Sequence, residues 1–213
     1  MTTKEQLRNL LADLKITKKT NRRQVKERLV NLGYSSLEYP VYDGATKLCI
    51  VPKHADFVIK WSTTCYEVSD DWDEALEEVS IYNKAVEAGL GMFFPKTEVF
   101  CVVNGITFVI QEKIDFSALN TPNSKESKYK YQTRTVSPVI IEKMDNCFYQ
   151  MKRGRALNPL WASMAIVLYG KRKCKALCKF IIENSINDLH YSNIGYLKDK
   201  PIILDFSGYH RED

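Results

Sequence analysis

The sequence lacks any long apolar run, and this absence limits where the protein works. No stretch approaches the roughly 20 apolar residues that a membrane-spanning helix needs. Residues 1–5 are not followed by an apolar core of the kind that a secretory signal peptide carries. We therefore expect a cytoplasmic protein without a membrane partner, or one delivered into a host cell by a route that needs no such segment.

The chain also lacks a cysteine framework and a strong charge of either sign. Its six cysteines follow none of the spacings of small disulfide-rich domains, and 213 residues with 45% hydrophobic side chains can bury a core without cross-links. The net charge of +5 is small and scattered, which argues against a nucleic-acid partner and suits a polyanionic nucleotide. We expect reduced thiols and a chain that folds alone.

Hydrophobic periodicity divides the chain into three parts. Residues 1–36 are expected to form a helical extension, because leucines recur there at helical spacing. Residues 37–113 should form a small lobe of antiparallel strands with one helix, and residues 114–213 a reduced, mainly helical lobe. Strands followed by helices indicate an α+β protein built from two lobes.

Turn and cap signals locate the individual elements. The strongest hairpin signal is Asn104-Gly105, which separates two β-rich runs. A helix is expected over residues 70–88, because its acidic first turn suits the positive end of a helix dipole. In the last part of the chain we expect helices over residues 139–151, 160–168 and 174–183 and a late pair of strands that includes residues 201–204.

Two motifs near the C-terminal end carry groups that phosphoryl transfer requires. Asp188 precedes Asn193 by five residues, and Asp205 follows the apolar run 201–204. One carboxylate can orient an attacking hydroxyl, while an amide and a second carboxylate can hold Mg²⁺ or Mn²⁺ on a nucleotide triphosphate. The chain is therefore predicted to bind ATP.

A lysine and a glutamate upstream complete the set. Lys60 ends the apolar run 57–60, so that a strand delivers its ammonium group, and Glu78 lies on the helix that follows. An ammonium group that leaves a buried strand needs a carboxylate to fix its direction. We expect Glu78 to pair with Lys60.

These residues occur in the order of the protein-kinase signature set, and the chain resembles a small protein-kinase-like enzyme of the compact bacterial or phage type. The resemblance implies that Lys60 holds the α- and β-phosphates of ATP and that Glu78 pairs with Lys60. It further implies that Asp188 orients the acceptor hydroxyl, while Asn193 and Asp205 hold the metal ion.

The same resemblance implies where the rest of the nucleotide binds. Gln111, Glu112 and Lys113 would form the hinge whose backbone meets the adenine. The full glycine-rich loop of the family is missing, and Gly44 and Ala45 stand in its place between two short strands. Backbone N–H groups of this turn would cover the phosphates.

Other departures from the family leave the function open. Ile186-Asn187 replaces the usual His-Arg ahead of Asp188, and five residues follow Gly208, so we expect no control by activation-loop phosphorylation. The motif Asp-Leu-His-x-x-Asn, which contains His190, resembles that of the aminoglycoside and choline kinase branch more than the Asp-x-Lys form of the protein kinases. The preferred function is an ATP-dependent kinase acting on Ser, Thr or Tyr hydroxyls of proteins. A small-molecule kinase and a catalytically inactive pseudokinase scaffold are the alternatives.

Overall fold

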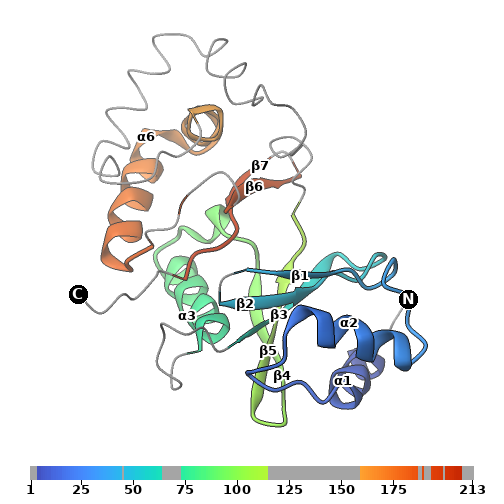
Figure 1. Cartoon of the computed structure of the whole chain (residues 1–213). Helices are drawn as coiled ribbons and strands as arrows, with labels where there is room; N and C mark the ends of the chain where they lie inside the picture. The colour runs from blue at the N-terminus through green and yellow to red at the C-terminus, as the bar shows by residue number, and fades with distance from the viewer. Residues whose placement is uncertain are drawn as a thin grey trace. The chain divides into compact units, whose positions relative to one another are not determined.

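The computed structural model describes residues 4–44, 46–63, 73–114, 159–186, 189, 193–198 and 200–207. These residues belong to two compact units, shown in Figure 1. The first unit takes the described residues up to Ser80 together with Lys96–Lys113, and the second takes Ile81–Pro95 and the described residues from Ile114 onward. The expected α+β class with a small antiparallel sheet is confirmed.

The first unit is built around a five-stranded antiparallel sheet in the order β1-β2-β3-β5-β4. Its strands are β1 (Val41–Asp43), β2 (Lys47–Ile50), β3 (Phe57–Ser62), β4 (Thr97–Val103) and β5 (Ile106–Glu112). Asn104 and Gly105 join β4 to β5 with φ angles of 52° and 74°. Two successive positive φ angles are what the tightest hairpin turns require, so the predicted hairpin is present.

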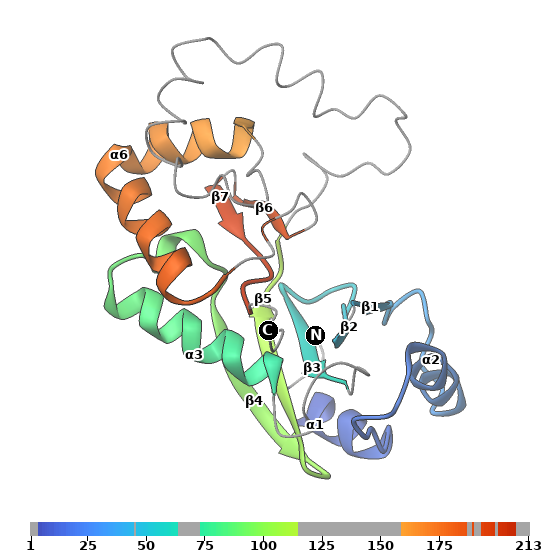
Figure 2. The same cartoon turned by 60° about the vertical axis from the view of Figure 1, so that its left-hand side comes forward.

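Two N-terminal helices cover one face of this sheet. They are α1 (Lys4–Asp13) and α2 (Arg22–Asn31), and Figures 1 and 2 show them on the opposite side of the sheet from α3 (Glu74–Glu87). Asn21 caps α2 reciprocally with Gln24: each side chain accepts a hydrogen bond from the other residue's backbone N–H. The core between helices and sheet includes Leu7, Leu11, Leu14, Val25, Leu29, Ile50, Ile59, Trp61 and Phe108. The described part of the expected extension, residues 4–36, therefore packs on the sheet within the first unit.

The second unit contains the last part of α3, a short 3₁₀ helix η1 (Gly91–Phe93), α6 (Pro159–Glu183) and the hairpin of β6 (Ile194–Leu197) and β7 (Lys200–Ile203). Trp161 of α6 donates its indole N–H to the carbonyl oxygen of Ile202, 3.2 Å away, which ties the helix to the hairpin. The expected helix over residues 139–151 lies outside the described residues. None of the described helices is long and apolar enough to cross a membrane.

Helix α6 differs from the expectation of two separate helices over residues 160–168 and 174–183. The structure joins them across a kink at Gly170, whose φ of 78° and ψ of 157° are not helical. This backbone conformation is essentially restricted to glycine. The glycine therefore changes the direction of the chain between the two helical parts without a connecting loop.

Candidate functional site

The two faces of β3 have different chemistry. Ile59 and Trp61 point into the apolar core beneath α1 and α2, whereas Lys60, between them, points to the other face. Its Nζ lies 3.1 Å from Oε2 and 3.3 Å from Oε1 of Glu78, on α3. Lys60 is 8% exposed and Glu78 is fully buried. The predicted ion pair between Lys60 and Glu78 is present.

A second set of contacts fixes α3 against β3 and so aligns this pair. Asp73 caps α3, because its Oδ1 accepts the Leu76 N–H at 3.1 Å. The same oxygen accepts the hydroxyl of Ser62, at the end of β3, at 2.6 Å. The Ser62 oxygen accepts in turn from the Ala75 N–H at 2.9 Å. The helix start is thus bound to the strand two residues beyond Lys60, which brings Glu78 over Lys60.

Two further charged residues, Lys47 and Glu74, join the pair. Lys47 of β2 places Nζ 2.9 Å from Glu78 Oε1 and 3.6 Å from Glu74 Oε2. Thr46 donates its hydroxyl to Glu74. Glu74 and Glu78 are four residues apart and share one face of α3, a spacing that is visible in the sequence. Lys47 and Glu74 are both buried.

The charged cluster of Lys47, Lys60, Glu74 and Glu78 is formally neutral, since it joins two ammonium groups and two carboxylates. Side-chain exposure in the cluster does not exceed 10%. Removing one partner from a buried ion pair leaves an uncompensated charge and costs roughly 3–5 kcal/mol. Each charge in the cluster therefore depends on the others. If one of these side chains is removed or turns away, another group must compensate the charge left behind.

Gln111, which the family resemblance places in a hinge, also contacts this cluster. It lies inside β5, paired with Val58 on one side and Thr97 on the other. Its Nε2 donates to Glu78 Oε2 at 3.3 Å and to Thr97 Oγ1 at 3.1 Å. The side chain is fully buried. Gln111 thus orients Glu78 from within the sheet.

Three backbone N–H groups in the segments expected to contact the nucleotide are hydrogen-bonded inside the first unit. Glu112 donates its N–H to the carbonyl oxygen of Lys96 at 2.8 Å, and Lys113 donates to that of Asp56 at 2.7 Å. The N–H of Gly44 donates to the carbonyl oxygen of Lys47 at 2.8 Å and so closes the β1–β2 turn. These three N–H groups are bonded within the first unit, and the cover of the phosphates by the turn at Gly44 and its neighbours stays a prediction. Ala45 lies outside the described residues.

Cys49 carries a thiol beside the cluster, opposite Lys60 in the ladder between β2 and β3. Burial raises the pKa of its thiol to about 11; Lys60 opposes this rise and Glu78 adds to it. At neutral pH the thiol is protonated. Cys49 is therefore a structural neighbour of the cluster and no nucleophile.

In the second unit, Asn193 and Asp205 lie at the same end of the β6–β7 hairpin. Asn193 precedes β6, and its carbonyl oxygen accepts the N–H of Leu204 at 2.8 Å, which extends the ladder beyond the pair of Ile194 and Ile203. Asp205 follows Leu204 directly. An amide and a carboxylate at one end of a hairpin fit Mg²⁺, which keeps several waters and takes one or two protein carboxylates beside phosphate oxygens. Asp188 and His190 lie outside the described residues.

An aromatic contact holds the backbone next to Asp205. Phe206 is fully buried, and its ring meets the ring of Phe94 edge to face with centroids 5.0 Å apart. Phe94 also contacts Phe180 of α6 at 5.8 Å. Within the described residues, no group of three His, Cys, Asp or Glu side chains converges as a preformed metal site. A metal ion held by Asn193 and Asp205 would need further ligands besides these two side chains.

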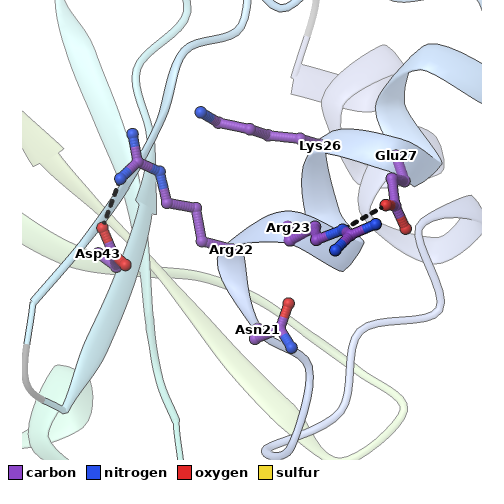
Figure 3. Close-up of a pocket in the computed structure, with 6 residues that line it drawn as sticks. All are labelled: Asn21, Arg22, Arg23, Lys26, Glu27 and Asp43. Atoms are coloured by element: carbon purple, nitrogen blue, oxygen red, sulfur yellow. Dashed lines mark hydrogen bonds and ion pairs between the residues drawn. The ribbon is translucent and has the colours of Figure 1, made fainter.

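A surface hollow of about 460 Å³ lies between the start of α2 and the end of β1 (Figure 3). It is lined by Asn21, Arg22, Arg23, Lys26, Glu27 and Asp43. Both arginines pair with carboxylates: Arg22 with Asp43 at 2.9 Å and Arg23 with Glu27 at 2.8 Å. Partly exposed pairs of this kind contribute at most about 1 kcal/mol. The pair of Arg22 and Asp43 ties α2 to the end of β1. We assign no ligand to this hollow.

Comparisons of the chain with family models, with curated proteins and with solved structures found no match. The functional argument therefore depends on the residues and contacts described above.

Proposed function

We propose that the protein is an ATP-dependent phosphotransferase of the protein-kinase-like type that phosphorylates hydroxyl groups of proteins. The observation that carries the proposal is the buried ion pair of Lys60 and Glu78, 3.1 Å apart, between the middle strand of an antiparallel sheet and the helix that follows it. A lysine in this setting is directed by its carboxylate and can be offered to phosphate oxygens.

The residues take the following roles in this reaction. Lys60 binds the α- and β-phosphates of ATP, and Glu78 orients Lys60. Asn193 and Asp205 hold Mg²⁺ or Mn²⁺, which neutralises charge on the phosphates when it is bound. Asp188 accepts a hydrogen bond from the acceptor hydroxyl and orients it toward the γ-phosphorus.

The chemical step forms one bond and breaks one. The acceptor oxygen attacks the γ-phosphorus, the bond from that phosphorus to the bridging oxygen of the β-phosphate breaks, and ADP leaves with the electron pair. The proton of the hydroxyl passes to the carboxylate of Asp188 and from there to solvent. Phosphoryl transfer needs little more from a protein than such positioning and charge stabilisation.

A kinase-like scaffold without catalysis is the second candidate function. One observation favours it: the N–H groups of Gly44, Glu112 and Lys113 are bonded inside the first unit. A kinase that binds ATP through these positions would have to use carbonyl oxygens or side chains instead. The two candidates therefore differ in whether ATP is turned over.

Transfer of label from ATP to protein tests the proposal. The full chain is incubated with γ-labelled ATP, Mg²⁺ or Mn²⁺ and a cell lysate, beside Asp188→Ala and Asp205→Ala. We expect label in lysate proteins with the intact chain and loss of that label with both variants. Label confined to small molecules would replace the protein acceptor by a small-molecule acceptor.

Binding measurements separate the remaining outcomes. Calorimetry with ATP and Mg²⁺ that detects binding without turnover would favour the scaffold. Absence of both binding and turnover with either metal would overturn the phosphotransferase. The same binding measurement is made on Lys60→Met. Its matched control is Lys53→Met, which removes an exposed lysine from a loop.

A further inference from the structure

Glu78 carries two ammonium groups at once, and the two lysines are not equivalent. Oε1 of Glu78 lies 2.9 Å from Lys47 Nζ and 3.3 Å from Lys60 Nζ. Lys47 also contacts the second carboxylate, Glu74, at 3.6 Å. Lys60 pairs with Glu78. Lys47 thus bridges both carboxylates of the cluster, whereas Lys60 adds a second cation to one of them.

The position of Lys47 in the chain holds it in place. It is the first residue of β2, and its carbonyl oxygen accepts the N–H of Gly44 across the β1–β2 turn at 2.8 Å. The preceding residue, Thr46, donates its hydroxyl to Glu74. Backbone and side-chain contacts therefore connect Lys47 and Glu74 through the same turn.

This asymmetry matters if Lys60 binds phosphate. Glu78 is fully buried, and its carboxylate loses part of its compensation when Lys60 shares its N–H donors between Glu78 and a phosphate. A carboxylate that keeps a second ammonium group at 2.9 Å and the amide of Gln111 at 3.3 Å is still compensated. Lys60 can then bind phosphate while it stays on Glu78, and the buried carboxylate remains compensated.

We propose that Lys47 is a positioning residue that keeps Glu78 compensated while Lys60 binds the phosphates of a nucleoside triphosphate. The inference rests on the proposed function and adds a second lysine to its site. Lys47 acts through Glu78 and does not touch the nucleotide. Without Lys47, Glu78 would hold more of the Lys60 charge, and ATP would bind more weakly.

A charge-balanced variant tests this role. Lys47→Met alone leaves Glu74 buried without its lysine and can lower stability for that reason. The double variant Lys47→Met/Glu74→Gln removes one charge of each sign, leaves Lys60 and Glu78 in place and retains an acceptor for Thr46. It should melt close to the wild-type temperature, yet the dissociation constant and KM for ATP with Mg²⁺ should rise about tenfold, with a smaller change in kcat.

Further variants and outcomes make the test decisive. Lys47→Arg retains the cation and should recover most of the lost ATP affinity, while Lys53→Met should leave affinity unchanged. Wild-type affinity in the double variant would overturn the role of Lys47 and leave the proposed function standing. If the wild-type chain itself binds no ATP with Mg²⁺ or Mn²⁺, the proposed function fails, and the role of Lys47 fails with it.

Discussion

Nε2 of Gln111 donates a hydrogen bond to Oε2 of Glu78, 3.3 Å away, although the two residues lie 33 positions apart in the chain. A carboxylate only accepts hydrogen bonds, so the amide must present its nitrogen to Glu78. Within the described residues, the amide oxygen of Gln111 has no hydrogen-bond partner. Gln111 is therefore held by its two donor contacts, to Glu78 and to Thr97.

This relationship predicts an order of stability among variants of Gln111. Gln111→Met removes both donor contacts in a buried site and should lower the free energy of unfolding by roughly 1–3 kcal/mol. Gln111→Glu places a carboxylate against Glu78 and should be the more damaging change near pH 7. Urea unfolding of the three proteins at pH 7 and pH 5 measures both effects. A Gln111→Glu protein as stable as the wild type at pH 7 would contradict the described contact.

Lys60 and Glu78 should act as one unit in turnover. Under the proposed function, Lys60→Met removes the phosphate ligand and Glu78→Gln removes the group that directs it. Both should lower kcat/KM to a similar extent, and the double variant should be little worse than either single variant, because groups that act together are not additive. Steady-state rates with ATP and Mg²⁺ measure this.

Folding must be checked in the same set of proteins. Glu87→Gln, an exposed position on the same helix, is the matched control for Glu78→Gln and should keep wild-type rates. Circular dichroism and melting temperature separate loss of catalysis from loss of structure. Full loss from Lys60→Met beside wild-type rates from Glu78→Gln would refute the coupling.

The sequence allowed the pair of Lys60 and Glu78 to be predicted, because both lie in strongly patterned elements. Lys60 interrupts an apolar strand, and Glu78 lies on a helix with a clear apolar face. The Asn104-Gly105 turn was equally readable, since few other dipeptides adopt two positive φ angles.

Lys47 could not be recognised in the same way. It stands at the start of a four-residue strand, next to a turn, where a lysine is usually exposed to water. Its burial results from α3, which packs over it from a different part of the chain. The contact of Gln111 with Glu78 was equally hidden, because the sequence shows only that Gln111 lies at the end of an apolar strand. In the structure, pairing with both β3 and β4 continues through Gln111. For both Lys47 and Gln111, contacts with elements distant in the sequence determine where the side chain lies.

The thiol of Cys49 predicts a loss of stability at high pH. Burial raises its pKa to about 11, above the usual value for a free thiol, so the folded protein keeps a proton that the unfolded chain releases. The stability that the protonated Cys49 thiol contributes is therefore fully present below about pH 8.5 and is lost as the pH rises toward 11. The free energy of unfolding should fall by up to about 3 kcal/mol over this range. Unfolding of wild type and Cys49→Val between pH 7 and pH 10.5 should show a shallower decline in the variant. Alkylation of Cys49 in the folded protein should be slow at pH 8, and rapid modification there would contradict the burial.

Gly170 and Gly44 should respond differently to the same substitution. Gly170 has a φ of 78° and a ψ of 157°, so a side chain there is strained although no atom lies within 4 Å of an added Cβ. Gly170→Ala should lower the free energy of unfolding by roughly 1–3 kcal/mol. At Gly44 the φ angle is not positive, and an added Cβ would meet the Lys47 carbonyl oxygen at an ordinary 3.6 Å. Gly44→Ala should therefore change stability by less than about 0.5 kcal/mol. Denaturant titration of the two variants tests whether the kink in α6 specifically requires a glycine. Equal losses of stability in both variants would argue against this requirement.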